Sequence, residues 1–121
     1  MNQQNLINEL VDLIRIKGFA FMPVDHLDAV AVININKAVG MYDVNAATPF
    51  DIAHEYFHII HNDTYRKNDY DIRNPQEKDA NESAVELLLN MYKNAGGTME
   101  HIQNFIDITG APDYWVVRLA N

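Results

Sequence analysis

The residues best suited to chemistry in this chain are two histidines and a glutamate in the segment His54-Glu55-Tyr56-Phe57-His58. On a helix, side chains four residues apart lie one above the other, so His54 and His58 can bind one metal ion, and Glu55 faces the same space. Zinc in hydrolases takes such a pair of imidazoles, a third protein ligand and a water whose proton a glutamate accepts. The spacing therefore predicts a zinc hydrolase site.

An ordinary amphipathic helix explains the same segment without a metal. At about 100° per residue, one stripe of this helix is polar and the remainder apolar. The polar stripe consists of Asp51, His54, Glu55, His58, His61 and Asn62. By chance, however, the five-residue pattern occurs in roughly one chain in a hundred of this length. We therefore favour the metal site and expect a third ligand elsewhere in the chain.

Glu77 is the best candidate for that third ligand. A helix is predicted from Asn74-Pro75, a cap followed by proline, to about Ala95, before Gly96-Gly97 end it. Glu77 lies in the middle of the apolar stripe of this helix. The same stripe and its flanks hold Ala80, Asn81, Ala84, Val85, Leu87, Leu88, Met91 and Tyr92. A carboxylate that faces a core is costly unless a charged or polar group meets it, and a metal ion is a natural partner.

Two alternatives to this assignment can be stated from the same helix. Glu77 is its third residue, where a glutamate often reaches back to the cap, here Asn74. Spacing alone also leaves Glu82 and Glu86 as acidic candidates, but they lie about 140° and 180° from Glu77 around the helix. The small side chains Ala80 and Ala84 would let this helix approach the histidine-bearing helix closely, which favours Glu77 as the ligand.

The remaining elements are expected to form a frame around these two helices. Residues 5–17 have the apolar spacing of a helix that ends at Gly18. Residues 19–27 are expected to form a connector with some extended character. Residues 29–35 and 38–44 predict a β-hairpin with a turn at Asn36-Lys37. Thr48 caps the histidine-bearing helix, with Pro49 and Asp51 in its first turn. Residues 62–74 predict a polar loop beside the site, a further helix follows Thr98 up to Gly110, and a short last helix spans 111–119.

Length and composition restrict the class of protein. A chain of 121 residues, 48% hydrophobic and 21% charged, is typical of one soluble globular domain with one core. It has no apolar run of membrane-spanning length and no leader-like start, so we expect a cytoplasmic protein. Because the chain has no cysteine, any metal must be bound by His, Asp or Glu side chains.

The charge balance indicates the kind of partner. Nine basic and seventeen acidic side chains give a net charge of −8, and no basic cluster exceeds Arg66-Lys67. This argues against direct binding of nucleic acid and favours a protein or peptide partner. The lone histidines His26 and His101 have no ligand partner by spacing, so we expect structural or solvent-exposed roles for them.

The combined pattern resembles a known family. His54-Glu55-Tyr56-Phe57-His58-Ile59-Ile60-His61, followed by Glu77-x-x-Ala80-Asn81-x-x-Ala84-x-Glu86-Leu87-Leu88, is similar to the ImmA/IrrE-type metallopeptidases of bacteria, phages and mobile elements. The resemblance implies that His54, His58 and Glu77 bind zinc, that Glu55 is the general base, and that Asn81 orients a ligand histidine. Departures from the family pattern at Asp79, Ser83 and Leu89-Asn90 affect none of these residues.

We therefore expect a small zincin-like α+β domain over residues 1–121. A short hairpin sheet would pack on about four to five helices, including the His54–His58 helix. By resemblance, we expect a zinc-dependent endopeptidase whose substrate is a helix-turn-helix repressor. The alternative is a metal-stabilised binding module that sequesters a repressor or another partner without cleaving it.

Overall fold

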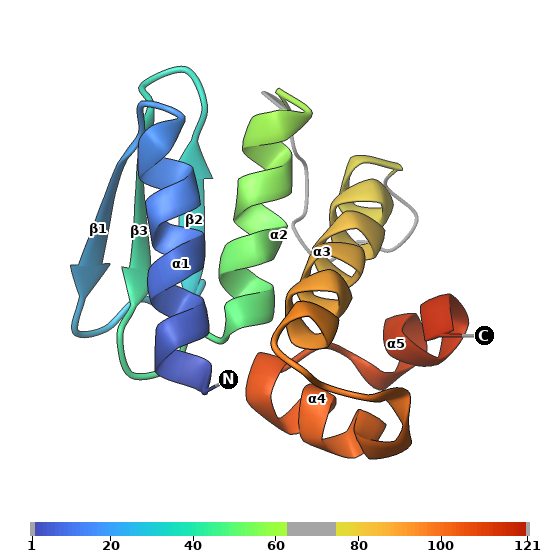
Figure 1. Cartoon of the computed structure of the whole chain (residues 1–121). Coiled ribbons are helices and arrows are strands. Elements are labelled where there is room, and N and C mark those ends of the chain that lie inside the picture. The colour runs from blue at the N-terminus through green and yellow to red at the C-terminus, as the bar shows by residue number, and fades with distance from the viewer. Residues whose placement is uncertain (1, 63–74, 121) are drawn as a thin grey trace.

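The protein is a small α+β domain in which five α-helices pack with a three-stranded sheet (Figure 1). The computed structural model describes residues 2–62 and 75–120. In chain order its elements are α1 (Gln3–Ile16), β1 (Ala20–Val24), β2 (Ala31–Asn34), β3 (Val39–Asp43), α2 (Pro49–Ile60), α3 (Pro75–Asn94), the 3-10 helix η1 (Met99–His101), α4 (Ile102–Thr109) and α5 (Asp113–Ala120). The predicted loop at 62–74 lies, beyond Asn62, outside the described residues.

The sheet contains the predicted hairpin and one strand more. Its order is β1-β3-β2, with β2 antiparallel to β3 and β1 parallel to β3. Residues 19–27, expected to be a connector, thus contain an edge strand that pairs Met22 with Met41. Pro23 argued against a strand there, but a proline is tolerated at a sheet edge, where its missing N–H faces no partner strand.

The centre of the sheet requires a residue without a side chain. Gly40 in β3 is buried, and a Cβ at this position would lie 2.6 Å from Ile33 Cδ1, 2.7 Å from the Val32 carbonyl oxygen and 2.8 Å from Phe21 Cδ1. The glycine lets side chains of both neighbouring strands close over the middle strand.

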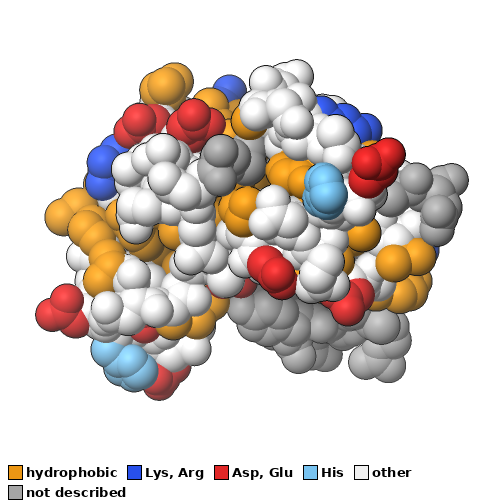
Figure 2. Space-filling model, turned by 60° about the horizontal axis from the view of Figure 1, so that its bottom comes forward, with side chains coloured by type: hydrophobic (Ala, Val, Ile, Leu, Met, Phe, Trp, Pro, Cys, Tyr) orange, Lys and Arg blue, Asp and Glu red, His pale blue; other side chains and the backbone are white. Residues whose placement is uncertain are grey.

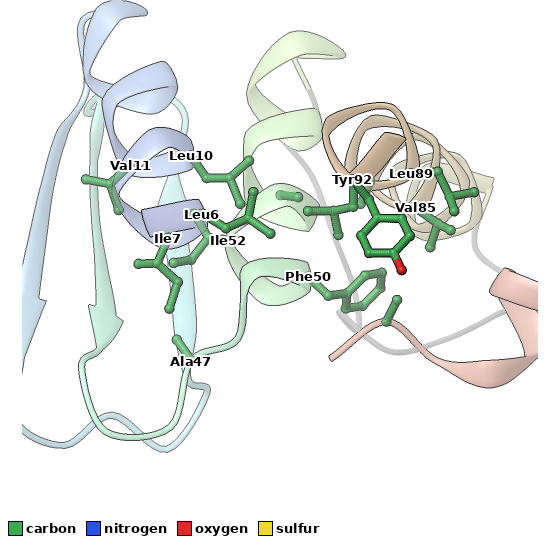
Figure 3. Packing of buried hydrophobic residues seen from close by; sticks show 14 of the residues in the cluster. Leu6, Ile7, Leu10, Val11, Ala47, Phe50, Ile52, Val85, Leu89 and Tyr92 are labelled. Carbon is green, nitrogen blue, oxygen red and sulfur yellow. The ribbon is translucent and has the colours of Figure 1, made fainter. Parts of the chain in front are cut away.

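One continuous core joins the sheet to the helices. α1 and α2 pack against each other and against the sheet, and α3 packs along α2 (Figure 1). Figure 3 shows the side chains that cross these contacts: Leu6, Ile7, Leu10 and Val11 from α1, Ala47, Phe50 and Ile52 at and before α2, and Val85, Leu89 and Tyr92 from α3. All are buried, so α2 is held on both sides.

The C-terminal elements differ in detail from their prediction. The helix expected after Thr98 begins as η1 and continues as α4, and its N-cap residue Thr98 forms no side-chain capping hydrogen bond. Gly110 ends α4 with φ 72°, a left-handed conformation that glycine adopts without strain. Figure 2 views the molecule from the end that carries α4, where hydrophobic side chains reach the surface in separate groups with acidic side chains between them.

The described helices are too short or too polar for a membrane span.

Candidate metal centre

The start of α2 is fixed by a reciprocal cap. The Thr48 hydroxyl accepts a hydrogen bond from the backbone N–H of Asp51, and the Asp51 carboxylate accepts one from the N–H of Thr48. This capping box satisfies backbone donors that the first helical turn leaves open. The register of α2, and hence the direction of its histidines, is therefore set one turn before His54.

The middle of the polar stripe of α2 faces the interior rather than solvent. His54 is 6% exposed, Glu55 3% and His58 0%. The solvated amphipathic helix considered from the sequence is therefore wrong for these three residues. Their polar groups are buried where α2 meets α3, so they require polar partners there.

Glu77 on α3 supplies that partner. Its carboxylate is fully buried, with Oε2 2.9 Å from His54 Nε2 and Oε1 2.9 Å from His58 Nε2. The two Nε2 atoms are 3.0 Å apart. Among the described residues, His54, His58 and Glu77 are the one group of three His, Cys, Asp or Glu side chains whose ligand atoms converge closely enough for a metal ion.

The ligand atoms fit a zinc ion after a small expansion. Zinc bonds of ~2.0–2.1 Å in a tetrahedral site hold neighbouring nitrogen and oxygen ligands ~3.3 Å apart. The present separations of 2.9 to 3.0 Å are a few tenths of an ångström shorter. The donor set of two imidazoles and one carboxylate, which leaves one of four positions open, is that of zinc hydrolases. The three residues could thus hold a metal ion.

Asn81 orients one of the imidazoles. Its Oδ1 lies 2.8 Å from His54 Nδ1 and accepts the ring N–H there. This hydrogen bond places a proton on Nδ1, so Nε2 is the nitrogen that faces Glu77 and His58, and its lone pair becomes available to a metal ion when the Nε2 proton is lost. Asn81 thus makes the contact that it needs in order to orient His54, as expected from the sequence.

The ionisation of the site suits a cation. Burial by itself raises the pKa of Glu77, but hydrogen bonds from His54 and His58 and their positive charge outweigh it and lower that pKa to about 2. Burial lowers the pKa of His54, yet the hydrogen bond to Glu77 and the charges of Glu55 and Glu77 raise it overall. Glu77 therefore stays ionised at neutral pH, as a metal ligand must.

Glu55 lies beside the ligands without belonging to the converging group. Its charge contributes to the raised pKa of His54, which requires the carboxylate to be close to the imidazole. Because Glu55 follows His54 on α2, its side chain is about 100° further round the helix. This position matches a group that acts on a water or substrate next to the metal.

The three other histidines lie outside the centre. His26 is exposed and contacts Asp28 at 2.9 Å, and His101 is exposed on η1, as expected for both. His61 follows α2 and its ring lies 5.9 Å from the ring of Phe57. None of the three shares a converging ligand group with other described residues.

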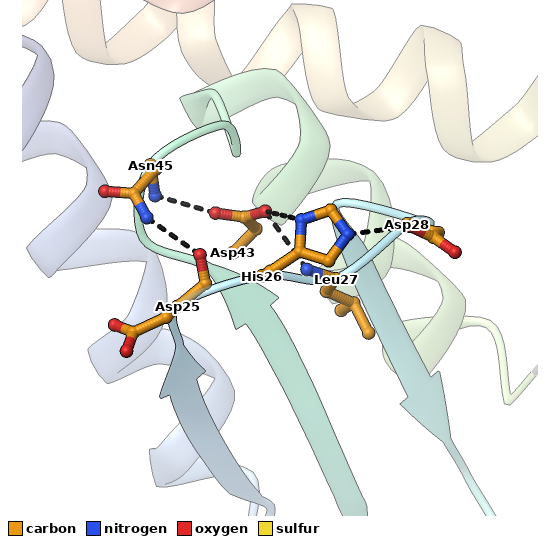
Figure 4. A network of polar contacts seen from close by, with 6 residues as sticks. All are labelled: Asp25, His26, Leu27, Asp28, Asp43 and Asn45. Atoms are coloured by element: carbon orange, nitrogen blue, oxygen red, sulfur yellow. Dashed lines mark hydrogen bonds and ion pairs between the residues drawn. The ribbon is translucent and has the colours of Figure 1, made fainter.

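A third buried acid, Asp43, was not predicted. Its carboxylate accepts hydrogen bonds from the backbone N–H groups of Asn45 at 2.8 Å and Leu27 at 3.1 Å, and Asn45 Nδ2 donates to the Asp25 carbonyl oxygen (Figure 4). These N–H groups lower the pKa of Asp43. Asp43-x-Asn45 directly after a strand is typical of an Asx turn and could have indicated this role. The network fixes the link that leads from β3 into α2.

The comparisons with known proteins assign no relatives to this arrangement. The chain matches no protein-family model, no curated protein and no solved structure at a significant level.

Proposed function

We propose that this protein is a zinc-dependent endopeptidase of the ImmA/IrrE type with a zincin-like fold. The observation that carries the proposal is the convergence of His54, His58 and Glu77 from two helices, with Glu55 on the same helix as the histidines. A site that only stabilised the fold would have no use for Glu55, a second buried acid beside the three ligands. The choice of zinc follows from the donor set.

The residues have distinct roles in this proposal. His54, His58 and Glu77 would hold the zinc ion, which when bound supplies a water of lowered pKa and polarises a carbonyl group. Asn81 keeps His54 in the orientation that binds metal. Glu55 accepts the proton of the water that adds to the peptide carbonyl carbon, and delivers it to the nitrogen as the C–N bond breaks.

The proposed substrate is a protein rather than a nucleic acid. The net charge of −8 disfavours direct contact with phosphates. By resemblance to the family, we propose a helix-turn-helix repressor whose cleavage releases the genes that it controls.

Cleavage of a candidate repressor by wild type and Glu55→Gln tests the proposal. We expect Glu55→Gln to keep its zinc but to lose at least about a hundredfold in rate, since it cannot accept a proton. Glu82→Gln on α3 is the matched control and should cleave normally, because Glu82 lies about 140° from Glu77 around the helix. Equal cleavage by wild type and Glu55→Gln would exclude the assigned base.

The alternative is a metal-stabilised module that sequesters its partner. One observation favours it: His58 and Glu77 are both 0% exposed, whereas a catalytic metal keeps a position open to substrate. In that case wild type and Glu55→Gln bind the repressor equally and neither shortens it. Intact-mass measurement of the repressor after incubation separates the two functions.

A further inference from the structure

α3 and α5 pack against each other (Figure 1). Residues at the start of α3 and in and before α5 line a hollow. Its volume is about 460 Å³, and it is lined by Lys78, Pro112, Tyr114, Trp115 and Arg118. This volume is in the range of small-molecule and side-chain pockets, ~300–1,000 Å³. The metal centre uses none of these residues.

The wall of the hollow is aromatic. Trp115 is 6% exposed and forms the inner part, while Tyr114 is 64% exposed and forms the outer part. Their rings meet edge to face with centroids 5.1 Å apart. Pro112 and the aliphatic stems of Lys78 and Arg118 complete a surface suited to an apolar group.

The two cations of the hollow differ in what they contact. The Arg118 guanidinium lies 5.7 Å from the centre of the Trp115 ring, with Nη1 3.3 Å from the Tyr114 hydroxyl and Nη2 3.8 Å from a Glu82 carboxylate oxygen. Lys78, by contrast, forms no ion pair with any residue in the described part of the chain. An ammonium group at the edge of an aromatic wall is thus available to an anion.

The hollow is separate from the metal centre although Lys78 follows Glu77 directly. Successive helix residues point about 100° apart, so Lys78 leaves α3 on a different side from the buried Glu77. Glu82 is paired with Arg118 rather than with Lys78. A ligand here would therefore meet one unpaired positive charge and would not touch the metal ligands.

We propose that this hollow binds a carboxylate carried on an apolar body, with the apolar part against Trp115 and Tyr114 and the carboxylate at Lys78. Two sources share this chemistry: the C-terminal residue of a peptide and a free branched or aromatic carboxylic acid. The site would give the protein a second recognition point that is independent of the metal.

The single tryptophan of the chain makes the proposal directly measurable. Because Trp115 is the only tryptophan and lines the hollow, a change in tryptophan fluorescence can be assigned to this residue. Titration with N-acetyl-leucine, which does not fluoresce, should change the emission saturably. N-acetyl-leucinamide, which lacks the charge, should bind about fivefold more weakly, as expected for loss of a partly exposed ion pair.

Two lysine variants test whether Lys78 provides the positive charge that binds the carboxylate. Lys78→Gln should bind N-acetyl-leucine about as weakly as wild type binds the amide, whereas Lys93→Gln, an exposed lysine in the last turn of α3, should bind like wild type. Circular dichroism verifies that both variants are folded. No saturable change with N-acetyl-leucine, equal binding of acid and amide, or equal losses in both lysine variants would each overturn the proposal.

Two further titrations show whether the ligand is a peptide C terminus or a free acid, and whether its binding is independent of zinc. Tighter binding of N-acetyl-leucine than of 4-methylpentanoate assigns the hollow to peptide C termini, and the reverse order assigns it to free acids. Binding should be the same with and without a zinc chelator. Dependence on zinc would contradict a separate site, whereas failure of the peptidase assay would leave the fluorescence result unchanged.

Discussion

At the scale of single residues, His54 shows how the site is prepared. One ring nitrogen is 2.8 Å from Asn81 Oδ1, and the other is 2.9 Å from Glu77 Oε2. Nδ1 therefore holds the ring in place through Asn81, and Nε2 is the nitrogen that could bind a metal ion. Neither function can be exchanged without rotating the imidazole.

Asn81→Ala tests the orienting contact. Without it the His54 ring loses its fixed tautomer, so zinc affinity should fall about 10- to 100-fold, as is usual for residues that support a ligand histidine. Competition with a chromogenic chelator measures the affinity. Asn90→Ala, exposed on the same helix, is the control. Equal affinities in the two variants would show that Asn81 does not orient the ligand.

The sequence allowed several of these residues to be predicted and not others. His54, His58 and Glu55 follow from a local spacing, and Glu77 follows from its place in an apolar stripe, because both patterns are set by helical geometry. Asp43 could not be found in this way. Its contact with Asn45 is local, but Leu27 is brought to it by the sheet, a long-range contact that no periodicity encodes.

At the scale of elements, the site depends on how closely α2 and α3 approach. Ala80 and Ala84 are both 0% exposed on the face that also carries Glu77. Their small side chains let the carboxylate of one helix reach the imidazoles of the other, as the sequence predicted. The parallel strand β1 was missed because Pro23 masks its pattern, and because parallel pairing with β3 is not visible in either strand alone.

Ala80→Leu should separate the helices. Extra methyl groups in a filled interface cost about 1–3 kcal/mol of unfolding free energy. We expect this loss together with weaker zinc binding, since Glu77 is displaced from the histidines. Urea unfolding and zinc titration measure both effects, with Glu86→Leu on the exposed side of α3 as control. Normal zinc affinity in Ala80→Leu would show that close approach is not required.

The link from β3 into α2 makes a pH-dependent contribution through Asp43. Backbone N–H groups of Asn45 and Leu27 lower its pKa below the ordinary value of 3.8. Its stabilising effect is therefore present above that value and is lost as the pH falls through the lower, folded-state pKa. Asp43→Asn should be less stable than wild type at neutral pH, and the difference should shrink below pH 3.8. Denaturant unfolding of both proteins across this pH range measures the difference in stability. A difference that does not change with pH would show that the Asp43 carboxylate is not the cause of the pH dependence.

At the scale of the whole molecule, one core connects the sheet, α1, α2 and α3 (Figure 3). That the chain forms a single domain over residues 1–121 remains a prediction. Since the ligands lie on two helices of this core, metal binding should stabilise the entire fold. At free zinc about 100 times its dissociation constant, the gain is ~2.7 kcal/mol.

Thermal unfolding with zinc and with chelator tests this coupling. We expect the midpoint of wild type to rise with zinc and that of His58→Ala to stay unchanged, because that variant lacks one of the three ligands. A zinc-induced rise of the same size in His58→Ala would indicate that the ion acts elsewhere.

Zinc stoichiometry is the measurement that shows whether His54, His58 and Glu77 form the metal centre. Elemental analysis of protein prepared without chelator should find one zinc per chain in wild type, Glu82→Gln and Glu86→Gln. Glu77→Gln should lose most of its zinc, because the buried carboxylate is replaced by a neutral amide. No zinc in wild type, or zinc retained in Glu77→Gln but lost in Glu82→Gln or Glu86→Gln, would contradict the account.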